Sequence, residues 1–239
     1  MKTTDAVTAN TLKLEDNDCP AAELPANDMA SKASDPGPLN RAFTYRWRMI
    51  VTLVVLLVAW IGAGFSPPFV QSGTLAAIFA DYCGWLMFFG GMSLRFWATR
   101  FIGGRKAGEV VCSGPYSLSR NPLYIGTFLM ILSLACFLKS PTFAVAAGIV
   151  IAYYCVAVVP LEERLLRYHF GTEYSKYCES IPRWLPRMGT IYSPSLPIIA
   201  HPMREEVRRS VWWLLFPLLG ELHAYFRGWS EWPHWWNLP

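Results

Sequence analysis

Charged residues are scarce in this chain. Of its 239 residues only 16% are Asp, Glu, Lys or Arg, whereas soluble domains carry about 25%. Hydrophobic residues make up 53% of the chain, and the mean hydropathy is +0.26. This composition excludes an ordinary water-soluble domain, because most of the surface must contact something other than water. The net charge of +4 is also too small and too dispersed to indicate nucleic-acid binding.

The chain also lacks the residue spacings of metal sites and disulfide frameworks. Its 6 cysteines form no CxxC pair, and its 4 histidines show no metal-ligand spacing. We therefore expect no bound metal and no disulfide framework. The thiols are expected to act as small buried apolar side chains.

The N-terminal segment has no apolar core of the kind found in a secretory signal peptide. Residues 1–40 carry several charges, among them Lys2, Asp5 and Glu15, between Ala, Pro, Ser and Asn residues. Low hydrophobicity of this kind is typical of segments that cannot form a packed core. We predict that residues 1–40 form a disordered cytoplasmic tail.

Long apolar runs dominate the rest of the sequence. Residues 49–67 contain no charge, and at about 1.5 Å per residue they can cross a hydrocarbon core of about 30 Å. Three further apolar segments follow, at residues 74–97, 121–138 and 140–161. This pattern predicts an all-α fold: a polytopic integral membrane bundle of four to five transmembrane helices, with its core in residues 41–200.

The fifth span is the least well defined. Residues 211–226 are apolar but contain Pro217 and Glu221, and 4 tryptophans follow before the end of the chain. Indole rings favour the membrane interface, where the ring is buried and the N–H stays hydrated. Residues 201–239 are therefore predicted to form a Trp-rich helix that either spans the membrane or lies at its surface, with a span favoured.

Basic residues alternate between the loops. They precede the first span and gather in residues 98–120 and 162–209. The loop at 66–80 has none, and the loop between the third and fourth spans has only Lys139. Cytoplasmic loops of membrane proteins carry the excess of Lys and Arg. The N-terminus and both basic segments are therefore expected on the cytoplasmic side, which brings the two most unusual polar stretches to one face of the membrane.

The first of these stretches surrounds the start of the third apolar run. Pro122 suits the first turn of a helix, and Asn121 suits the N-cap position before it. A capped helix entry with an interfacial Arg120 and Tyr124 explains these residues on local physics alone. A binding site explains them as well, and both interpretations stay open at this point.

The second stretch begins with two adjacent carboxylates at the end of the fourth apolar run. Glu163 has Arg167 four residues later, so a helical ion pair would explain it. Glu162 has only Val158 and Leu166 at the corresponding spacings. A carboxylate on the apolar face of a membrane helix is costly and so suggests a function, although its side chain could also extend to the interface.

Taken together, the two stretches resemble a known family. The segment Arg120-Asn121-Pro122-x-Tyr124-x-Gly126 is followed by Glu162-Glu163 and then by Phe170-Gly171-x-Glu173-Tyr174-x-x-Tyr177. Over residues 80–190 this pattern resembles the isoprenylcysteine carboxyl methyltransferase family, whose wider group includes the membrane phospholipid N-methyltransferases.

The resemblance implies a site for S-adenosyl-L-methionine. It assigns Glu162, Arg120 and Tyr124 to the catalytic set. The implied cofactor-binding residues are Gly108, Glu109, Val110, Val111, Tyr116, Asn121, Pro122, Leu123, Tyr124 and Glu162. Family members commonly have His at the position of Asn121, and the prenylcysteine enzymes place an Arg where this chain has Ala157 and Val158. The methyl acceptor is therefore left open.

The expected activity is methyl transfer from S-adenosyl-L-methionine to a lipid-like or prenylated acceptor, as in the isoprenylcysteine O-methyltransferases. Expected partners are a membrane lipid or a lipidated small molecule, with neither nucleic acid nor metal, and the active site is expected to face the cytoplasm. Three alternatives remain: a phospholipid-type N-methyltransferase, an NADPH-dependent sterol-type membrane reductase, and a non-catalytic membrane scaffold.

Overall fold

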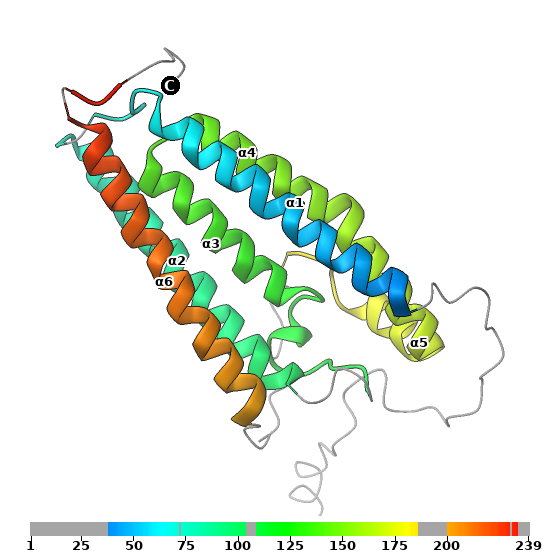
Figure 1. Cartoon of the computed structure of the whole chain (residues 1–239). Coiled ribbons are helices and arrows are strands. Elements are labelled where there is room, and N and C mark those ends of the chain that lie inside the picture. The colour runs from blue at the N-terminus through cyan, green and yellow to red at the C-terminus, as the bar shows by residue number, and fades with distance from the viewer. Residues whose placement is uncertain (1–37, 72, 104–108, 186–199, 230, 234–239) are drawn as a thin grey trace, which may run out of the picture.

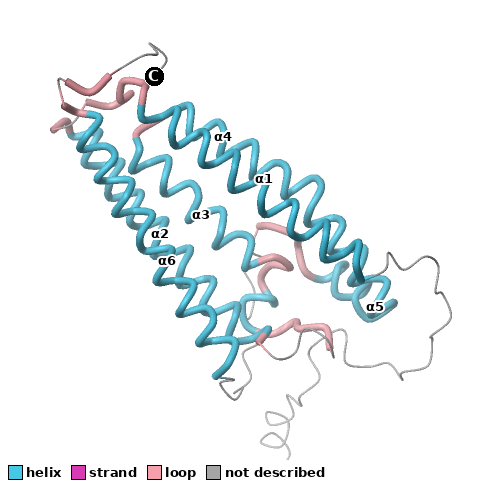
Figure 2. Tube along the Cα trace, in the orientation of Figure 1, coloured by secondary structure: helices cyan, strands magenta, loops and turns pink. Residues whose placement is uncertain are grey.

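The computed structural model describes residues 38–71, 73–103, 109–185, 200–229 and 231–233. All regular elements in these residues are helical, as the sequence predicts (Figures 1 and 2). In chain order they are α1 (Pro38–Gly64), α2 (Leu75–Ile102), the 3-10 helix η1 (Gly114–Ser117), α3 (Pro122–Leu138), α4 (Pro141–Tyr153), the π-helical turn η2 (Tyr154–Val158), α5 (Val159–Ser180) and α6 (Ala200–Arg227).

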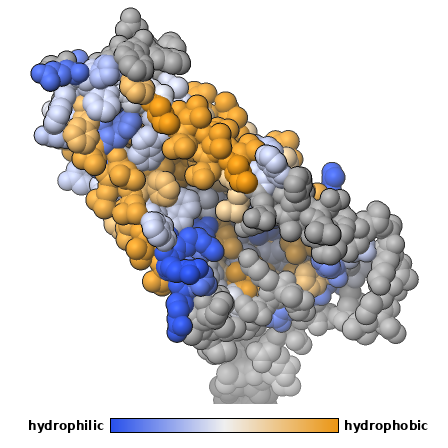
Figure 3. Space-filling view, viewed as in Figure 1, coloured by the Kyte–Doolittle hydropathy of each residue, from blue (hydrophilic) through white to orange (hydrophobic). Residues whose placement is uncertain are grey.

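The surface of the bundle suits a membrane. Three helical segments of the described chain are long and apolar enough to cross one, at Trp47–Gly64, Leu75–Ile102 and Pro141–Ser180, and α3 is a shorter apolar helix. Only 11% of the first and 22% of the other two windows is buried inside the protein, so their apolar side chains face outward. Figure 3 shows an apolar surface across the middle of the molecule, between more polar ends. The prediction of a helical integral membrane bundle is confirmed.

The helices form two groups, and α3 connects them because it also packs against α4. Helices α2, α3 and α6 pack along one another, and α1 lies beside α4 (Figure 1). Helices α2 and α3 approach closely at Gly91 and Gly126, where a Cβ on Gly91 would lie 2.5 Å from the carbonyl oxygen of Gly126. Small residues permit such close packing of membrane helices. Gly126, the glycine of the motif at the start of α3, therefore permits the close contact between α2 and α3.

Helix α6 covers the predicted C-terminal helix, residues 201–239, only as far as Arg227, and the described residues after it, 228, 229 and 231–233, are not helical. It begins at Ala200, well before residue 211, and continues through Pro217 to Arg227. It is not among the three segments that meet the length and hydropathy criteria for a span. It nevertheless packs along both α2 and α3, so it is an integral part of the bundle.

Arg227 connects α6 to α1 and α3 at the end of the bundle opposite the N-terminus of α3. Arg227 is 1% exposed, and its guanidinium donates to the carbonyl oxygens of Ala63 at 2.7 Å and Leu138 at 2.9 Å. These carbonyls lie at the C-terminal ends of α1 and α3, where a positive charge is favourable. Trp232 adds a hydrogen bond from Nε1 to the Gly64 carbonyl oxygen at 2.7 Å.

Two expectations on local features need correction. Residues 38–40 of the predicted tail are the first residues of α1, and residues 1–37 lie outside the described part. Cys112 is disulfide-bonded, so the expectation that the cysteines act as small apolar thiols is wrong at this position. The other described cysteines are free thiols. Among the described residues no group of three His, Cys, Asp or Glu side chains is placed to hold a metal ion.

Candidate functional site

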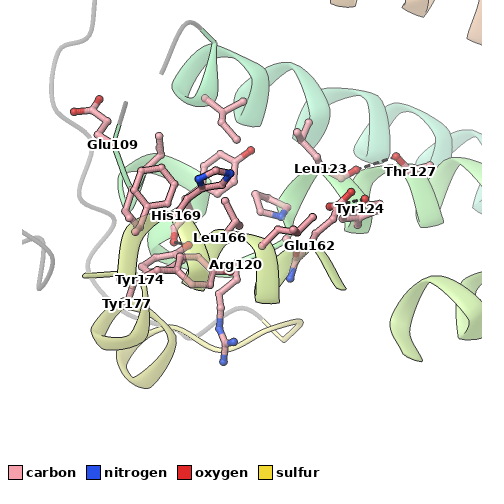
Figure 4. Close-up of a pocket in the computed structure, with 18 of the residues that line it drawn as sticks. Glu109, Arg120, Leu123, Tyr124, Thr127, Glu162, Leu166, His169, Tyr174 and Tyr177 are labelled. Atoms are coloured by element: carbon pink, nitrogen blue, oxygen red, sulfur yellow. Dashed lines mark hydrogen bonds between the residues drawn. The ribbon is translucent and has the colours of Figure 1, made fainter. Parts of the chain in front are cut away.

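A cavity of about 560 Å³ lies at the end of the bundle where α3 begins. Its walls come from α1, α2, η1, α3, α5 and α6, together with residues 109–111. Figure 4 shows lining residues from α3 and α5, together with Glu109. Pockets for small-molecule ligands typically measure about 300–1,000 Å³. The cavity is therefore large enough for a nucleoside-sized ligand, and it draws on segments that are far apart in the sequence.

Pro160 shapes the helix that carries the two carboxylates. Proline has no N–H to donate and its ring clashes with the preceding turn of an α-helix. Pro160 is the second residue of α5, and the turn directly before α5 is η2, which is π-helical. A π-turn takes more residues per turn than an α-helix and is frequent at functional sites. The spacings of a regular α-helix therefore do not apply across residues 154–158.

Glu162 lies at the junction of three helices. Its Oε1 accepts from Nη2 of Arg48 at 2.7 Å, and its Oε2 accepts from the hydroxyl of Tyr124 at 2.7 Å. The side chain of Glu162 stays 36% exposed, whereas that of Arg48 is 11% exposed. The sequence shows no basic partner at helical spacing, and α1 supplies one from 114 residues away. The carboxylate is thus paired and still accessible from the cavity.

Glu163 points into a different environment. Its side chain is 4% exposed and binds Arg183 through both oxygens, at 3.0 Å from Nε and 2.6 Å from Nη2. Nη1 of Arg120 donates to the same carboxylate at 3.3 Å. Arg167, the expected helical partner, is exposed and takes no part, so the expectation of an i,i+4 pair is wrong. The reason is that Glu163 faces the protein interior whereas Arg167 faces solvent.

Arg120 connects the start of α3 to the segment after α5. Its Nε donates to the Ile181 carbonyl oxygen at 2.7 Å, and its side chain extends away from Glu162 and Tyr124 in Figure 4. Hydrogen bonding to Glu163 also raises the pKa of Arg183 above its ordinary value. Asn121 sits at the N-cap position of α3 but makes no capping hydrogen bond; its Nδ2 donates to the Arg183 carbonyl oxygen at 3.4 Å.

Gly171 bends α5 back over the cavity. Its φ of 55° and ψ of −123° lie outside the helical region and in a region that L-residues avoid. Phe170 precedes the bend, and Tyr174 and Tyr177 follow it, yet all three line the cavity. The Tyr177 hydroxyl donates to the Tyr116 carbonyl oxygen at 2.8 Å. The bend thus explains why glycine occurs between aromatic residues in this motif.

Tyr116 presents a hydroxyl with no hydrogen-bond partner among the described residues. The residue is 6% exposed and lines the cavity. Burial raises the pKa of this phenol, and the nearby charge of Arg95 opposes the rise. Buried polar groups are normally hydrogen-bonded, so a lone hydroxyl at a cavity wall calls for an explanation.

The structure brings the residues expected at the site together. All of those that it describes line the cavity: Glu109, Val110, Val111, Tyr116, Arg120, Asn121, Pro122, Leu123, Tyr124 and Glu162. Gly108 lies outside the described residues. Their individual roles stay predictions.

Other lining residues were not expected from the sequence. These are Arg48, Arg95, Ile102, Thr127, Leu165, Leu166, His169, Phe170, Tyr174, Tyr177 and Arg209. Phe170, Tyr174 and Tyr177 belong to the motif that carries the resemblance, although no site role was assigned to them. Arg48 and Arg95 lie inside or beside apolar runs, where a charge is costly without a function. Arg209 carried no such signal, since it is one of several arginines in a polar segment.

The fold and the cavity define a class of helical membrane proteins with a cavity at one end of the bundle, lined by apolar residues and several charged side chains. Residues 80–173 match the phospholipid methyltransferase family model. Protein-S-isoprenylcysteine O-methyltransferase A of Arabidopsis thaliana is 32% identical over 77 residues, which cover 32% of this chain and 39% of that protein. The predicted resemblance to the isoprenylcysteine carboxyl methyltransferases and their wider group is thereby confirmed.

Two longer matches carry different names. The nickel-cobalt-cadmium resistance protein NccN of Alcaligenes xylosoxydans xylosoxydans is 28% identical over 75% of this chain and 83% of its own length. The cobalt-zinc-cadmium resistance protein CzcN of Cupriavidus metallidurans is 29% identical over 78% of this chain and 88% of its own length. No solved structure gives a significant match.

Proposed function

We propose that this protein is a membrane methyltransferase that transfers a methyl group from S-adenosyl-L-methionine to an amphiphilic acceptor. The observation that carries the proposal is the hydrogen bond between Tyr124 and Glu162, 2.7 Å long. It joins the two motifs of the methyltransferase resemblance at one cavity. That cavity lies at the end of a bundle whose long helices are apolar on their outer faces.

The residues present fit the cofactor. A nucleoside with an amino-acid side chain needs acceptors for its ammonium, donors for its carboxylate and apolar or aromatic surface for its base. The cavity offers the carboxylate of Glu162, several guanidinium groups, and the rings of Phe170, Tyr174 and Tyr177. The unpartnered hydroxyl of Tyr116 is a further contact that a bound ligand would complete.

Glu162 is suited to hold a cation in this cavity. An ionised carboxylate accepts about four hydrogen bonds, and Arg48 and Tyr124 use two of them. The remaining positions can accept from the ammonium of the cofactor in charge-assisted contacts. S-adenosyl-L-methionine supplies a methyl group activated by a sulfonium cation. The protein's tasks are then to align the two substrates and to exclude water.

The acceptor is proposed to enter from the lipid. O-methylation of a carboxylate, as in the isoprenylcysteine enzymes, would neutralise both the carboxylate and the sulfonium, which an apolar site favours. N-methylation of an amine would require the amine to arrive neutral. We propose a carboxylate acceptor, with the cavity at the cytoplasmic side, as the basic residues around it predict.

Binding measurements test the cofactor assignment. Isothermal titration of detergent-purified protein with S-adenosylhomocysteine should show one site, and titration with NADPH should show none. Binding of NADPH alone would support a reductase instead, and binding of neither would support a scaffold. Incubation with labelled S-adenosylmethionine and a lipid extract, followed by mass analysis of the labelled product, would then identify the acceptor.

The names of the two longer relatives suggest the cellular setting in which this methylation acts. Because the matches span most of NccN and CzcN, we propose that the methyl transfer contributes to resistance against divalent metals such as cobalt and cadmium. Growth of a deletion strain in cobalt or cadmium should be restored by the wild-type chain. A chain with Glu162→Gln should fail to restore it, and equal rescue by both would separate resistance from methyl transfer.

A further inference from the structure

Arg95 is a charged residue of α2 to which the proposed methyl transfer assigns no individual role. Its side chain is 12% exposed. It donates from Nε to Oε1 of Glu206 at 2.8 Å and from Nη1 to the hydroxyl of Thr127 at 2.6 Å. A Cβ on Gly126 would lie 2.7 Å from Cγ of Arg95. The absence of a side chain at Gly126 therefore leaves room for the Arg95 side chain against α3.

Glu206 holds a second arginine at the same place. Its side chain is 4% exposed, and its Oε2 accepts from Nη1 of Arg209 at 3.0 Å. Two guanidinium groups therefore share one carboxylate and leave a net positive charge. Both Arg95 and Arg209 line the cavity. Within the described residues, no partner accepts from Nη2 of either arginine, so each retains donors for a ligand.

Tyr116 lines the same cavity and offers a third donor. The charge of Arg95 acts on the Tyr116 phenol, whose buried hydroxyl has no partner among the described residues. Because burial raises its pKa, this phenol keeps its proton and can donate a hydrogen bond. Two guanidinium groups and one hydroxyl, all with unused donors, are the chemistry that recognises an anion.

We propose that Arg95 and Arg209, positioned by Glu206 and joined by the Tyr116 hydroxyl, bind a carboxylate or phosphate group in the cavity. The proposal rests on the proposed methyl transfer and names the acceptor class: an amphiphile with an anionic head. Arg209 belongs to α6, outside residues 80–173 that match the phospholipid methyltransferases. A determinant outside the shared segment suits a group particular to this protein's acceptor. The cofactor's own carboxylate is the other source of the same chemistry.

Arg209→Gln tests the site with little risk to the fold, because the Arg209 side chain is 56% exposed and Glu206 keeps Arg95. The matched control is Arg208→Gln on the same helix, where the side chain is 73% exposed and pairs with Glu205. Tyr116→Phe is a second variant, since it removes a hydroxyl that no described group uses. Dodecyl phosphate in dodecyl maltoside micelles, with S-adenosylhomocysteine present, is the anionic probe.

Loss of one charge-assisted hydrogen bond corresponds to roughly tenfold to hundredfold in affinity. We expect Arg209→Gln to weaken dodecyl phosphate binding by about tenfold or more. Tyr116→Phe should weaken it by a smaller factor, and Arg208→Gln should leave it unchanged. Equal binding by wild type and both cavity variants would overturn the proposal.

The two sources of the anion are separated by the cofactor arm. S-adenosylhomocysteine carries the amino-acid carboxylate, and 5′-methylthioadenosine lacks it. If Arg209→Gln weakens only S-adenosylhomocysteine, the site serves the cofactor and the acceptor assignment is overturned. If wild type binds neither nucleoside but binds dodecyl phosphate in an Arg209-dependent way, the anion site stands and the proposed methyl transfer fails.

Discussion

Glu162 and Glu163 are adjacent in the sequence and lie in two different regions of the protein. Glu162 belongs to the cavity wall, where it is 36% exposed and bound by Arg48 and Tyr124. Glu163 belongs to a buried joint, where it is 4% exposed and bound by Arg183 and Arg120. The comparison teaches that a pair of carboxylates can divide its tasks, because neighbouring residues of a helix point in directions about 100° apart.

The largest expected effect is on the stability of the fold, through the buried ion pairs of Glu163 with Arg120 and Arg183. Glu163→Gln removes the charge that compensates Arg120, whose side chain is 14% exposed, and Arg183. Breaking one side of a buried ion pair costs about 3–5 kcal/mol, and we expect the lower end because Arg183 is partly exposed. Thermal unfolding in detergent measures the loss, with the exposed Glu179→Gln as the matched control. An unchanged melting temperature would remove the structural role from Glu163.

The next effect falls on ligand binding. Glu162→Gln removes an acceptor charge at the cavity wall, and the affinity for S-adenosylhomocysteine should fall by about tenfold or more, since hydrogen bonds to charged groups contribute roughly 1.5–3 kcal/mol. The melting temperature of the ligand-free protein should fall less than for Glu163→Gln. Titration calorimetry with folded variants makes the measurement. Equal, small effects of both substitutions on affinity would contradict the division of roles.

The smallest effect concerns the hydroxyl that joins the motifs. Tyr124→Phe keeps the ring and removes one hydrogen bond to Glu162. This hydroxyl acts on the ligand only by orienting Glu162, so we expect a smaller loss, about fivefold in affinity, which corresponds to about 1 kcal/mol. Tyr153→Phe, 44% exposed on the neighbouring helix, is the control. Identical affinity in both variants would leave Tyr124 as a packing residue.

Local sequence patterns predict much of this molecule. The four apolar runs correspond to α1, α2, α3 and the helix that begins at Pro141, because each signal depends on residues within one segment. The motif around Asn121 and Tyr124 and the carboxylate Glu162 also meet at one cavity. Partner assignments within helices were less successful. The expected pair of Glu163 with Arg167 does not form, since spacing along a helix does not show which face meets the rest of the protein.

The sequence by itself determined that the chain is a helical membrane protein with two methyltransferase-like motifs, because apolar runs and motif residues are properties of short segments. Only the tertiary structure decided which charges pair. The Arg48–Glu162 bond spans 114 positions, and Arg95 meets Glu206 across 111. Such contacts depend on how α1 and α6 pack against the motif-bearing helices, and on the turns at Pro160 and Gly171 that redirect the chain between them.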